Sequence, residues 1–342
     1  MMLRSVVSGR SRSQSSGAVA GVRQVARRLR RTLERGRVRC SRAGVGIVLV
    51  YHRLDEPGGD PSRELVPALA SSLFEAQLKR LRSRYRIVPP SALLEEMRRR
   101  RFGARIPVAV TFDDDLASHV EVTLPVLRRL GIPAGFFLCG ASLERPYSFW
   151  WDDLQRAVDG RAEALRDIAV PGGTSLADAL ARTPGSLRAA ARAIEQASPD
   201  ERARIAAELR ELTEAEAGTA LDASGVRALA EAGFEIGFHT LRHEPLPTVA
   251  DAELSRALED GRARLEQVAG QPLKMLAYPH GRAGTREARA VRAAGYVCAF
   301  TGRPEAVRAD DDPFLLGRIE PSFESVEVFE AQLGRALRAT RR

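Results

Sequence analysis

The chain has 342 residues, of which 44% are apolar, and it carries a formal net charge of +9. This length can bury one large hydrophobic core or two smaller ones. No apolar run approaches the roughly 20 residues that a membrane-spanning helix needs. The three cysteines are scattered, and none stands in a metal-binding spacing, which favours a reducing, cytoplasmic compartment over an oxidising one.

Residues 1–43 hold the excess positive charge. They contain 12 arginines and one acid, a net of +11, which leaves −2 for residues 44–342. Aliphatic residues recur there at helical spacing from Val22 to Leu33, a pattern typical of a basic amphipathic helix on an anionic membrane surface. A disordered leader, or a stretch upstream of the true start, fits the same residues. Nucleic acid is a weaker expectation because the tail has no aromatic residue for stacking.

If the tail seeks a membrane, the protein will lie at the inner membrane surface. A variant that lacks residues 1–43 is then expected to lose sedimentation with anionic vesicles, because its basic face supplies the attraction. Unchanged sedimentation would remove the support for this interpretation.

From Gly44 onward, short β-rich runs alternate with helical stretches. Expected strands cover 46–51, 106–112, 134–139, 234–238, 273–278 and 296–300, and expected helices cover 71–84, 124–130, 251–269 and 285–294. Repeated strand-then-helix units predict an α/β fold with a parallel sheet or barrel and helices outside it. Residues 147–222 break this rhythm and contain no convincing strand, so they are expected to form a helical insertion on the rim.

The insertion opens with an aromatic cluster, and Trp150 and Trp151 are the only tryptophans of the chain. Such aromatics either anchor an insertion to the core or stack against a sugar ring. The sequence leaves both interpretations open.

The expected strand at 106–112 ends in three consecutive carboxylates, Asp113, Asp114 and Asp115. Like charges so close repel each other, so they need a cation, hydrogen bonds or protonation. The carboxyl ends of strands in α/β folds are where catalytic residues gather. The run therefore predicts a metal or catalytic role rather than a solvated turn.

The expected strand at 234–238 runs directly into His239, and His243 follows four residues later. Two histidines at this spacing lie on one face of a helical turn and can reach one ion. With Asp114 they offer two nitrogens and one oxygen and leave a position open, which is the pattern of a catalytic zinc site. The same ligands would accept cobalt, nickel or iron.

These motifs resemble those of the polysaccharide deacetylases, the NodB-homology domain of carbohydrate esterase family four. The family's Thr-Phe-Asp-Asp motif is matched by residues 111–114, its His-Ser/Thr-x-x-His motif by 239–243, and a reduced third motif by 277–281. The resemblance covers about 44–146 and 223–320. It implies a distorted (β/α) barrel for residues 44–342, with the insertion at about 147–222.

The resemblance also implies roles for single residues. Asp113 is expected to be the general base, and Asp114, His239 and His243 the metal ligands. The backbone N–H of His280 is expected to line an oxyanion hole. Tyr278 and Pro279 are expected to contact the substrate, and so are Trp150 and Trp151 if they stack against a sugar ring.

The chain departs from the family pattern in two places. Ala277 stands where relatives carry an arginine that supports the base, and no histidine follows the apolar run at 313–319, where relatives carry the general acid. His52, at the end of the first strand, is the best substitute acid by position; alternatively it is hydrogen-bonded beneath the metal site. His119 is expected to be structural, and Asp115 to cap the next helix.

Together these features predict a metal-dependent hydrolase that releases acetate from the N-acetyl group of an amino sugar. The sugar could belong to a polysaccharide, an oligosaccharide or a lipid-linked or nucleotide-linked precursor, and a cytoplasmic location favours a precursor. Two alternatives stay open: a glycan-binding relative that has lost turnover, and an O-deacetylase or deformylase on the same scaffold.

Overall fold

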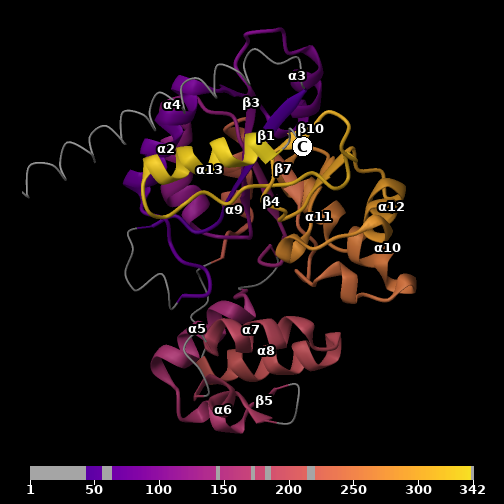
Figure 1. The fold of residues 1–342 in the computed structure, drawn as a ribbon. Coiled ribbons are helices and arrows are strands. Elements are labelled where there is room, and N and C mark those ends of the chain that lie inside the picture. Colours follow the sequence, from indigo (N-terminus) through magenta and orange to yellow (C-terminus); the bar gives the residue numbers. More distant parts are fainter. Residues whose placement is uncertain are drawn as a thin grey trace, which may run out of the picture. The chain divides into compact units, whose positions relative to one another are not determined.

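The fold is built on parallel strands, most of which are followed by a helix (Figure 1). The computed structural model describes residues 44–55, 64–143, 147–170, 174–181, 186–213 and 220–339. Within these ranges no helix is both long and apolar enough to cross a membrane. The basic tail at 1–43 lies outside the described residues, so its domain boundary and its membrane role stay predictions.

The main sheet has eight strands in the order β10-β1-β3-β4-β7-β8-β9, and β2 also pairs with β3. The strands are β1 (Val45–Tyr51), β2 (Arg86–Ile87), β3 (Pro107–Asp113), β4 (Gly135–Leu138), β7 (Glu235–Phe238), β8 (Met275–Ala277), β9 (Cys298–Phe300) and β10 (Val307–Arg308). From β1 to β9 all neighbours on this path are parallel, and β10 alone runs antiparallel to β1.

The central strands β1 and β3 are buried along their whole length. Both are continuous runs of mostly β-branched and aliphatic residues, as is usual for parallel strands that are covered on both faces. Inside the sheet, Val48, Ala109, Phe137 and Phe300 belong to one apolar cluster. The expected strands are therefore present, although their ends differ from the expected ones by a few residues.

The segment from Pro313 to Ile319 joins the two ends of this path. On one side Leu316 exchanges backbone hydrogen bonds with Ala299 of β9 and with Thr301, the residue that follows the strand. On the other side Ile319 exchanges them with Val48 and Val50 of β1. Both contacts are parallel bridges. The segment thus closes the sheet into the distorted barrel that the sequence predicts.

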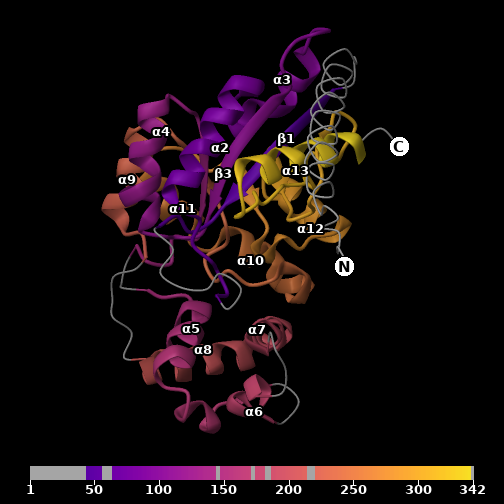
Figure 2. The ribbon, with the colours of Figure 1, turned by 60° about the vertical axis from the view of Figure 1, so that its left-hand side comes forward.

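Helices cover the outside of the sheet, and Figure 2 shows α2, α4 and α9 along one side of it. The barrel helices are α2 (Ser71–Arg84), α3 (Leu93–Arg99), α4 (Leu124–Leu130), α9 (Ala223–Glu231), α10 (Asp251–Glu259), α11 (Arg262–Ala269), α12 (Thr285–Ala293) and α13 (Val326–Ala339). The prediction of one helix over 251–269 is wrong. Gly261 adopts a left-handed conformation with φ 79° and separates α10 from α11.

The insertion has a small core of its own. It comprises α5 (Trp150–Gly160), β5 (Ala169–Val170), β6 (Thr174–Ser175), α6 (Leu176–Ala181), α7 (Ser186–Gln196) and α8 (Pro199–Thr213), which group together in Figures 1 and 2. Leu154, Leu176, Ile194 and Leu209 are buried in its apolar cluster. The expectation of no strand is wrong in one detail, because β5 and β6 form a two-stranded antiparallel ribbon.

Candidate active site

The end of β3 places two carboxylates in one cavity. Asp113 is the last residue of the strand, and Asp114 has φ 73°. Successive side chains of a regular strand point to opposite faces, but this left-handed turn redirects the chain, and both residues line the same cavity. A non-glycine residue in this conformation is strained, which is common at functional sites.

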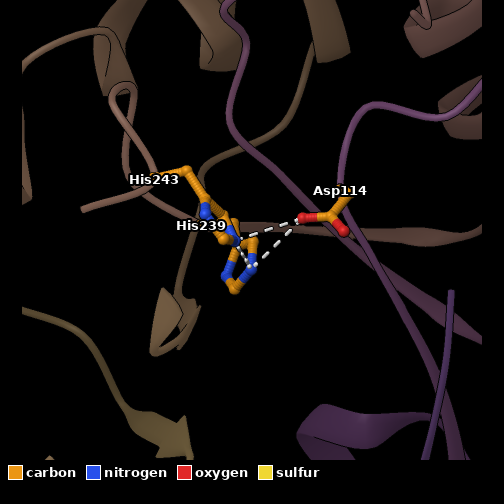
Figure 3. Close-up of side chains that lie close together, drawn as sticks. All are labelled: Asp114, His239 and His243. Atoms are coloured by element: carbon orange, nitrogen blue, oxygen red, sulfur yellow. Dashed lines mark hydrogen bonds and ion pairs between the residues drawn. The ribbon is translucent and has the colours of Figure 1, made fainter. Parts of the chain in front are cut away.

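Two histidines from the end of β7 converge on Asp114 (Figure 3). The Nε2 atom of His243 lies 3.3 Å from Asp114 Oδ1, and that of His239 lies 3.6 Å from it. The two Nε2 atoms are 3.1 Å apart. The prediction of a helical turn is wrong, because Thr240 and His243 have φ values of 57° and 48° in a loop. The loop nevertheless brings together the side chains that the spacing predicts.

The donor set fits a divalent cation. His239 donates from Nδ1 to the carbonyl of Ala277 at 2.8 Å, which leaves the lone pair of Nε2 facing Asp114. Burial lowers the pKa of His239 to about 4, so the ring is neutral at pH 7, as a metal ligand must be. The Oδ1 atom of Asp114 is buried without a hydrogen-bond partner among the described residues. A cation bound by Asp114, His239 and His243 would satisfy this oxygen.

Asp113 is held by an arginine that the sequence motifs did not indicate. Arg318 donates from Nη1 to Oδ1 at 2.7 Å and from Nη2 to Oδ2 at 2.6 Å, and its side chain is buried, at 2% relative exposure. Burial by itself would raise the pKa of Asp113, but the charge and hydrogen bonds of Arg318 outweigh it and hold the pKa below its ordinary value. Asp113 is therefore ionised at neutral pH.

Asp115 does not cap the following helix, contrary to expectation. Its buried carboxylate accepts hydrogen bonds from the backbone N–H groups of Cys139, Gly140 and Ala141, at 2.8, 3.3 and 3.0 Å. Burial outweighs these bonds and raises the pKa of Asp115 to about 6. The residue thus fixes the loop after β4 beside the site.

A cavity of about 650 Å³ joins these residues to others that the sequence singled out. His52, Trp150, Trp151 and His280 all line it. Trp151 stacks on Phe149 with centroids 4.3 Å apart, and its ring lies 4.7 Å from that of His243. Trp151 thus both anchors the insertion and forms part of the cavity wall.

Two predicted substrate contacts are not in the cavity. The side chain of Tyr278 is fully buried, and its hydroxyl donates to the carbonyl of Phe314 at 2.9 Å. Pro279 is buried as well, and neither residue lines the cavity wall. This part of the third motif packs into the barrel, so the structure does not bring these two side chains to the cavity. His280 has φ 56°, and the oxyanion role of its N–H stays a prediction.

Two further histidines lie at different depths. His119 is buried, and its Nε2 lies 2.9 Å from the carbonyl oxygen of Asp113. It thus holds the backbone turn at Asp113 and Asp114, as expected of a structural residue. His52 is partly exposed at the cavity edge, with Nδ1 3.9 Å from a carboxylate oxygen of Glu320. Of these two histidines, His52 is the one that lines the cavity.

Comparison of the sequence with known families gives one match in the same region. The model of the family described as polysaccharide deacetylase matches residues 194–299, which contain the second and third motifs. The first motif precedes the insertion and lies outside the match. No curated protein matches the chain.

Several solved structures have similar folds. Streptococcus pyogenes deacetylase PplD, in complex with acetate, is 15% identical with a TM-score of 0.53 and covers 86% of this chain and 98% of its own. IcaB from Ammonifex degensii is 19% identical with a TM-score of 0.54 and covers 86% and 97%. A polysaccharide deacetylase from Bacillus cereus is 18% identical with a TM-score of 0.54 and covers 84% and 69%.

These findings confirm the resemblance to the polysaccharide deacetylases that the motifs indicate. At such identities the solved structures establish the fold, which is that of a polysaccharide deacetylase. The family match, which includes His239 and His243, supports a deacetylase activity.

Proposed function

We propose that this protein is a metal-dependent hydrolase that removes the N-acetyl group of an amino sugar. The observation that carries the proposal is the meeting of Asp114, His239 and His243 beside an ionised Asp113 in one cavity. The cation is zinc, for which two imidazoles and one carboxylate are a common catalytic ligand set, and cobalt, nickel or iron would also be accepted.

Bound there, the cation would polarise the acetyl carbonyl and make an attacking water more acidic. Asp113 takes the proton of that water as the general base. Arg318 uses one lone pair on each carboxylate oxygen and leaves others for the water. The backbone N–H of His280 is proposed to stabilise the oxyanion. His52, whose Nδ1 lies 3.9 Å from a carboxylate oxygen of Glu320, is proposed to donate a proton to the departing amine.

Chelation tests the metal requirement. Incubation with a chelator should abolish acetate release from N-acetylated oligosaccharides, and added zinc should restore it, because the ligands converge on a single ion. The measurement is enzymatic detection of acetate, with metal content followed in parallel. Full activity in the metal-free protein would contradict the proposal.

The same assay separates the alternatives. Binding of the oligosaccharide without acetate release, whatever the metal supplied, would favour a glycan-binding protein without turnover. Release of acetate from esters but never from amides would favour an O-deacetylase, and release of formate from N-formyl sugars a deformylase.

A further inference from the structure

The insertion forms part of the cavity wall. Helix α7 contributes Arg192 and Glu195 to the lining of the cavity that holds Asp113 and Asp114. The two α7 residues are three apart, so they lie on the same face of the helix. The barrel contributes Arg282, just after the third motif, to the same lining.

Both carboxylate oxygens of Glu195 contact residues of the barrel. Its Oε2 accepts a hydrogen bond from Nη2 of Arg282 at 2.8 Å, and its Oε1 lies 3.3 Å from Nδ1 of His280. Because both oxygens have partners, the negative charge of Glu195 is compensated within the protein. The contact also fixes α7 against the loop after β8.

Arg192 differs from the other arginines of the cavity. Arg318 is paired with Asp113, and Arg282 with Glu195. Arg192 is exposed, and its side chain forms no hydrogen bond or ion pair with any residue that the structure describes. It is thus the arginine of this lining whose charge remains available to a bound molecule.

We propose that Arg192 binds an anionic substituent, a phosphate or a carboxylate, on the acetylated sugar. A guanidinium presents paired N–H groups that match both anions. A cavity of about 650 Å³ is of the size that holds a small-molecule ligand and extends beyond the reacting acetyl group. That the ligand is an acetylated sugar rests on the proposed function. That the protein prefers an anionic ligand rests on Arg192 of α7.

Binding measurements test this preference with the metal-loaded, full-length protein. Titration calorimetry compares N-acetylglucosamine with its 1-phosphate and with N-acetylmuramic acid, and acetate is assayed in the cell afterwards. We expect one or both anionic sugars to bind more tightly than the neutral one. Arg192→Gln should lose about tenfold in affinity for that anion, the usual cost of a charged hydrogen bond, and keep its affinity for the neutral sugar.

Two variants make the result specific. Arg192→Lys keeps the charge and should retain most of the preference. Arg227→Gln removes another exposed arginine, on α9 and outside the cavity, and should bind all three sugars as the natural protein does. Preference for the phosphate or for the carboxylate identifies the substituent.

Equal binding of the three sugars would overturn the inference. So would an anion preference that survives Arg192→Gln, because the anion would then be bound elsewhere, for instance at the metal. If no sugar released acetate, the proposed function would be contradicted. The preference for an anionic sugar would still be decided by the binding data alone.

Discussion

Replacing Asp113 by asparagine should lower the turnover number for acetate release by about 100- to 10,000-fold, the usual contribution of a general base. The amide keeps the shape of the carboxylate but cannot accept the proton of the attacking water. The bound metal should remain, because Asp114, His239 and His243 are its ligands. The measurements are the kinetics of acetate release and the metal content of the purified variant.

Asp114→Asn is the matched comparison, because it changes the neighbouring carboxylate in the same way. It should lose metal as well as activity. If Asp113→Asn lost its metal, Asp113 would be a metal ligand instead of the base. If Asp113→Asn kept the turnover number of the natural protein, Asp113 would have no role in the reaction.

His52→Gln in the same assay should lower the turnover number with little change in KM. An unchanged turnover number would reject His52 as the acid.

The convergence of Asp114, His239 and His243 could be predicted from sequence because its cause is local. β3 and β7 are apolar runs that stop in polar residues. Parallel strands place their carboxyl ends at one edge of the sheet. Side chains that follow two such strands must therefore lie near each other, whatever the conformation of the loops. The spacing suggested the wrong local structure for His239 to His243 and still gave the right neighbours.

The partner of Asp113 could not be found in this way. Arg318 lies 205 residues further along the chain, in a segment whose position depends on barrel closure between β9 and β1. The only local signal was an arginine within the apolar run Phe314 to Ile319. Such a charge is rarely buried without a partner, but the sequence does not say which acid pairs with it.

Side-chain direction and insertion contacts were equally inaccessible. Tyr278 belongs to a motif that reaches the cavity through His280, yet its own ring is buried, and its hydroxyl donates a hydrogen bond to the carbonyl of Phe314. Glu195 belongs to an insertion without a recognised motif, and its meeting with Arg282 depends on how two separate cores pack. The break at Gly261 was hidden because the apolar periodicity continues from α10 into α11.

Arg318→Met should destabilise the protein by about 3–5 kcal/mol, the usual cost of removing one partner of a buried ion pair. It should also raise the pKa of Asp113, because burial then acts on the carboxylate without the compensating guanidinium. On acidification, kcat/KM should therefore begin to fall at a higher pH than in the natural protein. Arg227→Met, on the exposed face of α9, should change stability by no more than about 0.5 kcal/mol.

The pH dependence of stability distinguishes this electrostatic role from simple packing. In the natural protein the pKa of Asp113 is lowered by folding, so its contribution is present above the unfolded pKa of about 3.9 and is lost as the pH falls through the folded value. In Arg318→Met the folded pKa is raised, so stability should instead be lost as the pH rises through it. Urea unfolding of both proteins with chelator present, from pH 5 to 8, should therefore give a difference that grows with pH. A constant difference would mean that Arg318 stabilises the barrel by packing alone, and that another group keeps Asp113 ionised.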